Sequence, residues 1–295
     1  MILRIDPRSV MVWTSPTTVQ FGVDRVVLSL ELDPVRERLL AALQAGCTFR
    51  ALCRVGRIEP VPARQGVDEA AVERFVGQLR PVLMAPHASS SPSSSRRSSV
   101  VPSGTVDARA PVHVVQCTTS GSQQTDEAAS ARAIAELLRV AGRPVTAGRG
   151  IPPSAGETPE FAVLLAAWSV PPAAFQRYLS DGVPHLPVVF GDESVRLGPL
   201  VRPGRSACVR CLHLERRDRE SAWPVVAAQL AGTRAPQEGG ALAFDAAGRA
   251  ARVARTWLDE GRDVLRGGSV SLQLRSRSEK WTWHRPHAEC GCRSP

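Results

Sequence analysis

Four cysteines in two close pairs are the residues of this chain whose types and spacing best fit a specific chemistry. Cys208 and Cys211 form a C-x-x-C motif, and Cys290 and Cys292 form a C-x-C motif much later in the sequence. Each pair can present two sulfurs from one turn, and two such pairs make the tetrahedral four-thiolate set typical of zinc. Four thiolates leave no open coordination position, so the sequence predicts a structural rather than a catalytic Zn²⁺ ion.

The backbone around these pairs and the other possible uses of the thiols also matter. Gly204 precedes the first pair and Gly291 lies inside the second, and glycine adopts the dihedrals that let both sulfurs of a pair converge. The alternatives are a surface redox pair, a disulfide, or replacement of one sulfur by a histidine (His213, His284 or His287). A disulfide is disfavoured because no secretory signal is evident. Three further cysteines occur singly: Cys47, Cys53 and Cys117.

Composition bounds the class of protein. A chain of 295 residues with 43% hydrophobic residues can form two domains, each with a core. It has no apolar run long enough to span a membrane and no apolar targeting core at its start, so we expect a cytoplasmic protein and no membrane partner. The net charge of +9 comes from arginine, since Lys280 is the only lysine, and it favours acidic partners without identifying one.

Residues 1–86 are predicted to form one small domain. Alternating apolar residues indicate three strands near 11–13, 19–22 and 26–30. Asp33 and Pro34 then fit the N-cap and first position of a helix that ends at Gly46. Thr48 can cap a second helix and Asp68 a third. Three strands followed by three helices predict a winged-helix-like module.

Residues 87–110 are rich in Ser, Pro and Arg and are expected to be a flexible linker. From residue 111 to 295 the pattern is α/β, with strands expected at 112–117, 144–147, 161–168, 186–190 and 194–198. A long helix is expected between Phe244 and Leu258, followed by a hairpin of 270–274 and 280–284. Trp281 and Trp283 share one face of that hairpin, and we expect them to be buried under the zinc loop.

The segment around the first cysteine pair resembles a known family. It reads G-P-L-V-x-P-G-R-x-x-C-x-R-C-L, is followed by R-x-D-R and A-W-P, and the chain later carries H-x-x-C-G-C. Residues 161–292 resemble the ThiF-like activating-enzyme superfamily, and more narrowly the divergent branch found in azoline-peptide (bacteriocin) cyclodehydratases. The resemblance implies a Rossmann-like α/β domain and, by analogy with relatives that dimerise, a possible homodimer. It also implies that the zinc ligands are Cys208, Cys211, Cys290 and Cys292.

In that branch the N-terminal module is a winged-helix-like recognition element for ribosomally made peptides. The resemblance implies that the leader of a precursor peptide adds as an extra strand beside the third strand, against the third helix. The peptide-binding residues by this analogy are Val26, Val27, Leu28 and Leu30 on the strand, and Val72, Val76 and Leu79 on the helix.

The expected nucleotide site departs from the family. The turn after the first strand, Cys117, Thr118, Thr119, Ser120 and Gly121, lacks the G-x-G-x-x-G pattern that brings backbone amides to ATP phosphates. The second strand ends at Ala147-Gly148 without the acid that would bind ribose hydroxyls. Arg143 or Arg149 would have to replace a phosphate-binding lysine, a poor exchange. We therefore interpret the nucleotide loop as degenerate, expect no ATP, and interpret Cys117 as a buried cysteine rather than a nucleophile.

Three functions remain in order of preference. The first is a non-catalytic ThiF-like protein that binds a leader peptide or a partner protein and presents it to a separate ATP-dependent cyclodehydratase or other modifying enzyme. The second is an adenylyltransferase that activates a C-terminal carboxylate. The third is a winged-helix protein that binds nucleic acid, which is disfavoured because the predicted third helix opens with Asp68, Glu69 and Glu73 and would repel phosphates.

Overall fold

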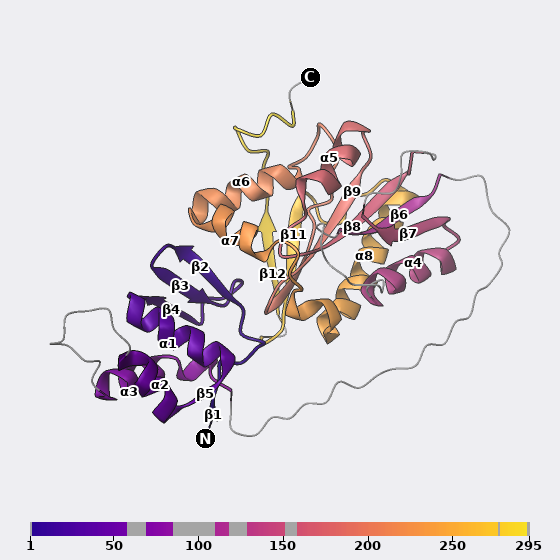
Figure 1. Ribbon diagram of the computed structural model, residues 1–295. Coiled ribbons are helices and arrows are strands. Elements are labelled where there is room, and N and C mark those ends of the chain that lie inside the picture. The colour runs from indigo at the N-terminus through magenta and orange to yellow at the C-terminus, as the bar shows by residue number, and fades with distance from the viewer. Residues whose placement is uncertain are drawn as a thin grey trace. The chain divides into compact units, whose positions relative to one another are not determined.

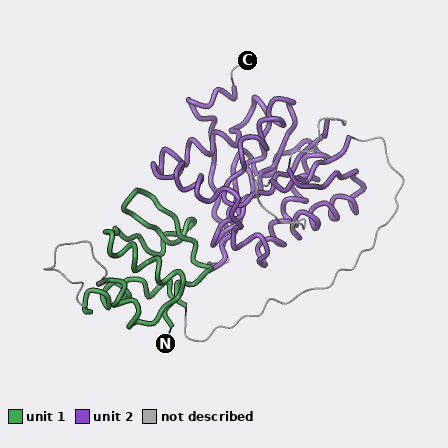
Figure 2. The backbone as a smooth tube through the Cα atoms, viewed as in Figure 1, with its two compact units in different colours: residues 1–105 green, residues 106–295 purple. Residues whose placement is uncertain are grey.

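The computed structural model describes residues 2–57, 69–84, 110–117, 129–150, 158–276 and 278–293. The chain divides into two compact units, residues 1–105 and 106–295 (Figures 1 and 2). Of the segment predicted to be a linker, 87–110, all but residue 110 lies outside the described residues.

The N-terminal unit contains a three-stranded antiparallel sheet. Its strands are β2 (Met11–Ser15), β3 (Thr18–Phe21) and β4 (Leu28–Glu31), in the order β2-β3-β4. A short pair, β1 (Ile2–Leu3) with β5 (Cys47–Thr48), lies elsewhere in the unit. The three predicted strands are confirmed, but β4 begins at Leu28, so Val26 and Val27 belong to the connection before it. Among the described residues β4 pairs with β3 alone, so its other edge is open.

Three helices complete this unit: α1 (Pro34–Ala45), α2 (Phe49–Arg57) and α3 (Glu69–Gln78), followed by the 3-10 turn η1 (Arg80–Val82). The predicted cap of α1 is confirmed, because Asp33 accepts hydrogen bonds from the backbone N–H groups of Val35 (2.9 Å) and Arg36 (2.8 Å). Gly46, with φ of 87°, ends the helix. Leucines of α1 pack with Phe21 and Phe75 in the core of the unit. The expected cap of the third helix, Asp68, lies outside the described residues.

The second unit is built on a seven-stranded mixed sheet in the order β12-β11-β10-β9-β8-β6-β7. The strands β7, β6, β8 and β9 run parallel to one another, and β10, β11 and β12 continue the sheet antiparallel. Their bounds are β6 (Val112–Cys117), β7 (Val145–Arg149), β8 (Phe161–Ala167), β9 (His185–Phe190), β10 (Ser194–Leu197), β11 (Gly268–Gln273) and β12 (Glu279–Trp283). The α/β class predicted from the sequence is confirmed.

Helices cover both faces of this sheet. On one face α4 (Ala129–Val140) and α8 (Ala241–Glu260) pack together, and α8 lies over β8 to β11 (Figure 1). On the other face α5 (Pro172–Ser180) and the start of α6 (Val209–Arg219) bury apolar side chains against β6, β8 and β9. The remaining elements, α7 (Trp223–Leu230) and the 3-10 turn η2 (Pro236–Gly239), link α6 to α8. None of the helices in the described part of the chain is both long and apolar enough to cross a membrane.

The two tryptophans of β12 contradict the prediction that they are buried. Trp281 and Trp283 are 44% and 65% exposed and contact each other edge to face, with 5.7 Å between ring centroids. They lie opposite Val270 and Gly268 of β11. Because β12 is the last strand at its end of the sheet, its side chains have a neighbouring strand on one side alone, and the rings remain open to solvent.

The cap of α1 makes a testable prediction about the N-terminal unit. Asp33→Ala should destabilise this unit by about 1 kcal/mol, because two amides of the first helical turn lose their acceptor. Hydrogen exchange of α1 amides, followed by mass spectrometry on the full chain, should report the loss. Asp33→Ser should exchange at nearly the native rate, because serine also caps helices; equal exchange in all three proteins would show that the cap does not stabilise α1.

Candidate functional site

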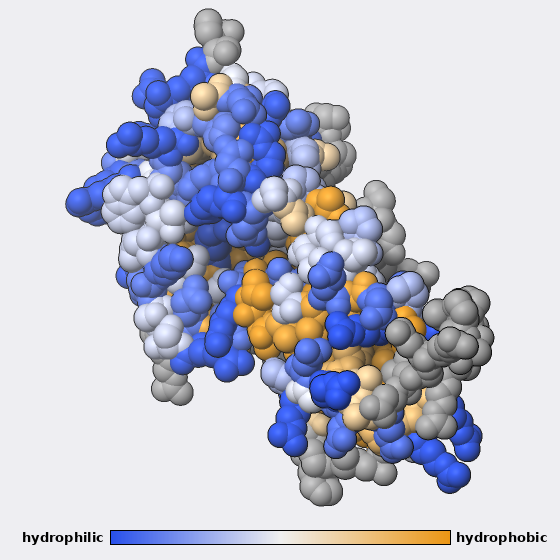
Figure 3. All heavy atoms as spheres, turned by 90° about the vertical axis from the view of Figure 1, so that its left-hand side faces the viewer, coloured by the Kyte–Doolittle hydropathy of each residue, from blue (hydrophilic) through white to orange (hydrophobic). Residues whose placement is uncertain are grey.

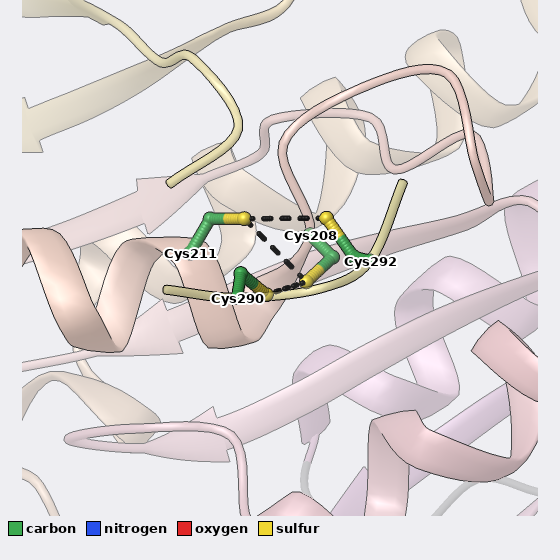
Figure 4. A group of neighbouring side chains, drawn as sticks. All are labelled: Cys208, Cys211, Cys290 and Cys292. Carbon is green, nitrogen blue, oxygen red and sulfur yellow. Dashed lines mark hydrogen bonds between the residues drawn. The ribbon is translucent and has the colours of Figure 1, made fainter. Parts of the chain in front are cut away.

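The four paired cysteines meet at one point of the second unit. All four Sγ atoms lie within 4.8 Å of one another. The separations are 3.7 Å for Cys208–Cys211, 3.4 Å for Cys208–Cys290 and 3.5 Å for Cys211–Cys292, and all four are free thiols (Figure 4). The fold thus joins two motifs that are 82 residues apart in the chain.

The first pair is positioned by the start of α6. Cys208 is the N-cap residue of the helix, with extended φ and ψ, and Cys211 lies in its first turn. This spacing turns both sulfurs to the same end of the helix, where the helix dipole favours negative charge. The loop before it turns at Gly204, with φ of 71°, and Ser206 accepts a hydrogen bond from Arg202 N–H at 2.8 Å. The role predicted for Gly204 is confirmed.

The second pair is held in a tight turn. Gly291, between the two cysteines, has φ of 68°, as predicted for a C-x-C motif whose sulfurs converge. Cys290 N–H donates to the carbonyl of His287 at 3.0 Å. The His287 N–H in turn donates to Cys211 Sγ at 3.3 Å, which couples the turn directly to the first pair.

Polar contacts between the tail and α6 support the cluster. His284 Nδ1 pairs with Glu215 at 2.8 Å, His287 Nε2 pairs with Asp218 at 2.8 Å, and Arg217 pairs with Glu289 at 2.9 Å. The second nitrogen of each ring is also occupied: His284 Nε2 bonds Ser269 Oγ at 2.8 Å, and His287 Nδ1 accepts from Glu289 N–H at 3.2 Å. Neither ring has a free nitrogen for a metal, which argues against the alternative that either one replaces a sulfur. His213 packs edge to face on Phe175 instead.

The thiols affect each other's ionisation. Hydrogen bonds from the Cys208 thiol, and then from backbone N–H groups, lower the pKa of Cys211 to about 4, against the opposing effect of burial. Its bond with Cys211, followed by burial, raises the pKa of Cys208, while burial and then the Cys211 bond raise the pKa of Cys292 to about 11. A thiolate on Cys211 is thus accommodated readily, whereas ionisation of Cys208 and Cys292 is disfavoured unless a positive charge lies beside them.

The geometry of the cluster fits a metal ion. A tetrahedral ion with metal–sulfur bonds of about 2.3 Å has sulfurs about 3.8 Å apart, and the observed contacts of 3.4 to 3.7 Å are close to that value. Cys208, Cys211 and Cys290 are buried and Cys292 is partly buried. This group of four thiols can hold one metal ion.

A second candidate site is a cavity of about 340 Å³ at the carboxyl ends of β6 and β8. From β6 the chain runs to β7 on one side, and from β7 it crosses back to β8 on the other side of β6. Such a change of direction creates the crevice where open α/β sheets bind ligands. Its wall includes Trp168, whose φ of 63° is unusual for a bulky residue and whose Nε1–H donates to Thr233 Oγ1 at 3.0 Å. Sequence reasoning assigned Trp168 only to the end of a strand, since a backbone conformation leaves no local sequence signal.

Two of the titratable residues that line the cavity, Cys117 and His213, carry no charge at neutral pH. Burial raises the pKa of Cys117 to about 12 and, with nearby arginines, lowers the pKa of His213 to about 4, so both groups are neutral at pH 7. At the rim Arg234 pairs with Glu238 at 3.8 Å. A protonated thiol with a very high pKa is a poor nucleophile, as expected for an unreactive Cys117. The side chain is partly rather than fully buried, which differs from the prediction.

The strand beside β6 differs from the prediction. β7 continues to Arg149, two residues beyond its expected end, because its residues pair in parallel with β6 as far as Gln116. The strand therefore ends in a cation where a ribose-binding acid was sought. Thr118, Thr119, Ser120 and Gly121 of the predicted degenerate loop lie outside the described residues.

The predicted peptide-binding residues fall into two groups. Val26 and Val27 are 53% and 42% exposed, and Figure 3 shows apolar side chains reaching the molecular surface among polar ones. The helix positions differ: Val72 and Leu79 are fully buried, because they form part of the core of the N-terminal unit. They are therefore not the wall of an open groove. Leu28, Leu30 and Val76 are partly buried against the same core.

Comparison with known proteins finds likeness in solved structures. No family model matches the sequence, and no curated protein matches it. A heterocyclase in complex with substrate and cofactor aligns with 98% of this chain at 19% identity and a TM-score of 0.46. A chain of the E. coli microcin synthetase McbBCD complex aligns over 98% of this chain and 99% of its own length, at 13% identity and a TM-score of 0.46.

These neighbours are of the kind that the sequence motifs resemble. Another, E. coli MccB with ATP, aligns over 99% of this chain at 10% identity and a TM-score of 0.39. This chain spans 39% of the length of the first heterocyclase and 42% of the heterocyclase TruD. Because the sequence identities and TM-scores are this low, any activity, substrate or partner of this chain has to be argued from its own residues.

The environment of Cys117 predicts its reactivity. With a pKa of about 12, about one thiol in ten thousand is ionised at pH 8, so alkylation by iodoacetamide should be very slow and should accelerate as the pH rises. Peptide mapping by mass spectrometry should show Cys47 labelled before Cys117, because burial raises the pKa of Cys47 by less. Rapid labelling of Cys117 at pH 7 would instead indicate an activated nucleophile.

Proposed function

We propose that this protein is a non-catalytic, zinc-stabilised peptide-binding partner of a modifying enzyme. It binds the leader of a ribosomally made precursor peptide and presents the peptide to a separate ATP-dependent cyclodehydratase, which forms thiazoline or oxazoline rings. This is the role implied by the ThiF-like cysteine motifs, and the N-terminal unit supplies a physical means of performing it.

The open edge of β4 is the observation that carries the proposal. In an antiparallel pair, successive residues point their backbone N–H and C=O groups alternately toward the neighbouring strand and away from it. Leu32 N–H donates to Thr17 O, and Thr18 pairs with Glu31, so Leu30 and Leu28 also face β3. The backbone groups of Ser29 and Glu31 therefore lie on the free edge, where an extended peptide can add as a fourth strand.

Side chains beside this edge would provide selectivity. Val26 and Val27 present apolar surface to solvent directly before β4. Main-chain hydrogen bonds tolerate many sequences, whereas apolar contacts favour peptides with a hydrophobic residue at the matching position. With Val72 and Leu79 in the core, Val76 is the residue of the proposed helix wall that remains partly accessible.

The second unit supports a scaffolding rather than an adenylating role. Of the titratable groups that line its cavity, Cys117 and His213 are neutral at pH 7 and Arg234 is paired with Glu238, so the cavity itself offers little attraction for a triphosphate. The four-thiol cluster, which we propose binds Zn²⁺, ties the tail to α6 and stabilises the unit. Zinc in this site would act on folding and would not touch a substrate, because its four positions are filled by the protein.

The zinc assignment predicts a defined stoichiometry. The purified protein should contain one zinc per chain by elemental analysis, and Cys290→Ser should lose most of it and melt at a lower temperature, because one of four thiolates is missing. Cys117→Ser is the matched control and should keep its zinc. Full zinc content in Cys290→Ser would exclude these four residues as the ligand set.

The proposed peptide binding predicts that the backbone N–H of Ser29, on the free edge of β4, is needed for affinity. Calorimetry with candidate leader peptides should show binding to the native protein, and Ser29→Pro should abolish that binding with little effect on folding, because proline lacks the outward N–H and is tolerated on an edge. Ser29→Ala keeps the N–H and should bind like the native protein. Unchanged binding by Ser29→Pro would place the peptide elsewhere, and no binding by the native protein would remove the leader role.

A further inference from the structure

Arg149, the last residue of β7, has hydrogen-bonding groups that the fold leaves unused. Its Nε and Nη2 atoms are inaccessible to solvent, and neither has a hydrogen-bond partner among the residues that the structure describes. Buried donors are nearly always paired in folded proteins, because an unpaired one loses its bonds to water without replacement. A charged group raises that cost further, so these two atoms call for a partner.

The two atoms define the chemistry of that partner. Nε and Nη2 lie on the same edge of the planar guanidinium group, and their N–H bonds run parallel. This edge matches the two oxygens of a carboxylate or phosphate in a bidentate arrangement, the strongest hydrogen-bonded pairing that arginine makes. A neutral acceptor such as a ribose hydroxyl would satisfy one of the two and leave the charge uncompensated.

The surroundings of Arg149 also favour an anion. In the β6-α4-β7 unit the helix connects two parallel strands, so its first turn lies at the edge of the sheet where β6 and β7 end. A helix N-terminus carries partial positive charge. Ser130, the second described residue of α4, is 1% exposed, and its hydroxyl likewise has no partner among the described residues.

We propose that the carboxyl edge of β6 and β7 is an oxyanion site anchored by Arg149, which takes a ligand bearing a phosphate or a carboxylate. The site is separate from the peptide edge of β4 and from the thiol cluster, so it goes beyond the function proposed above. A cation at the end of this strand donates hydrogen bonds where a ribose-binding acid accepts them, so the site selects the charged group of a ligand rather than a nucleoside.

Thermal unfolding and calorimetry of the full chain test this assignment, with inorganic phosphate, acetate and AMP as probes at constant ionic strength. Phosphate or acetate should raise the melting temperature of the native protein, because a ligand that binds the folded state stabilises it. Arg149→Met should weaken the binding of the active probe about ten- to a hundredfold. Arg149→Lys should also weaken it, since lysine keeps the charge but lacks the fork.

Arg139→Met is the matched control, because Arg139 belongs to the same β6-α4-β7 unit but contacts Glu136 and the opposite end of β7. It should bind the probe like the native protein. Without ligand, Arg149→Met should be at least as stable as the native chain, because it removes unpaired buried donors. A response to phosphate alone or to acetate alone identifies the oxyanion, and AMP should bind no more tightly than phosphate.

Three results would overturn the proposal. The native protein responds to none of the three probes, or Arg149→Met and the native protein respond equally, or AMP binds far more tightly than phosphate and so reveals recognition of the nucleoside. Should Arg149→Met fail to fold, Arg149→Lys against the native protein gives the same comparison.

Discussion

The second unit depends on one constraint: the sulfur atoms of four cysteines lie within 4.8 Å of one another. Sulfurs 3.4 to 3.7 Å apart cannot all carry negative charge in a buried site without a cation between them. The cluster can therefore hold a metal ion, and it connects α6 to a tail that otherwise has little apolar surface. Three polar pairs between α6 and the tail, through His284, His287 and Arg217, hold the same two segments together. They fix the direction from which the second pair of cysteines arrives.

Two surfaces of the protein, the edge of β4 and the carboxyl edge of the parallel strands, offer different kinds of interaction. The edge of β4 presents backbone donors and acceptors, which suit an extended chain of almost any sequence. The carboxyl edge of the parallel strands presents a cavity beside β6 and β8, where the charged residues Arg234 and Glu238 are paired, and a guanidinium at the end of β7. The open edge of β4 is the surface that we propose for a peptide, and the end of β7 is the one that we propose for an anion.

The sequence predicted those parts of the structure whose causes are local. Asp33, Pro34 and Gly46 predict the ends of α1, because capping interactions act within a few residues. Gly204 and Gly291 likewise predict the turns beside the cysteines, because both have positive φ. The helix α6 was missed, since its alternating charged residues show no apolar stripe and just three of its residues are buried. The end of β7 was misplaced because pairing with β6, rather than local propensity, carries the strand on to Arg149. Val72 and Leu79 were assigned to a groove because helical spacing reveals an apolar face but not what covers it.

The distance along the chain between the two cysteine pairs has a consequence for how the protein is made. A ribosome adds about 5 to 20 residues per second, and 82 residues separate Cys208 from Cys290. The C-x-C motif is therefore synthesised roughly 4 to 16 seconds after the C-x-x-C motif. During that interval the nascent chain offers an incomplete pair of thiols, and β11 and β12 are also still missing from the sheet. Assembly of the four-thiol cluster and closure of the sheet thus come late in biogenesis, and the thiols of the new chain are most exposed to oxidation before them.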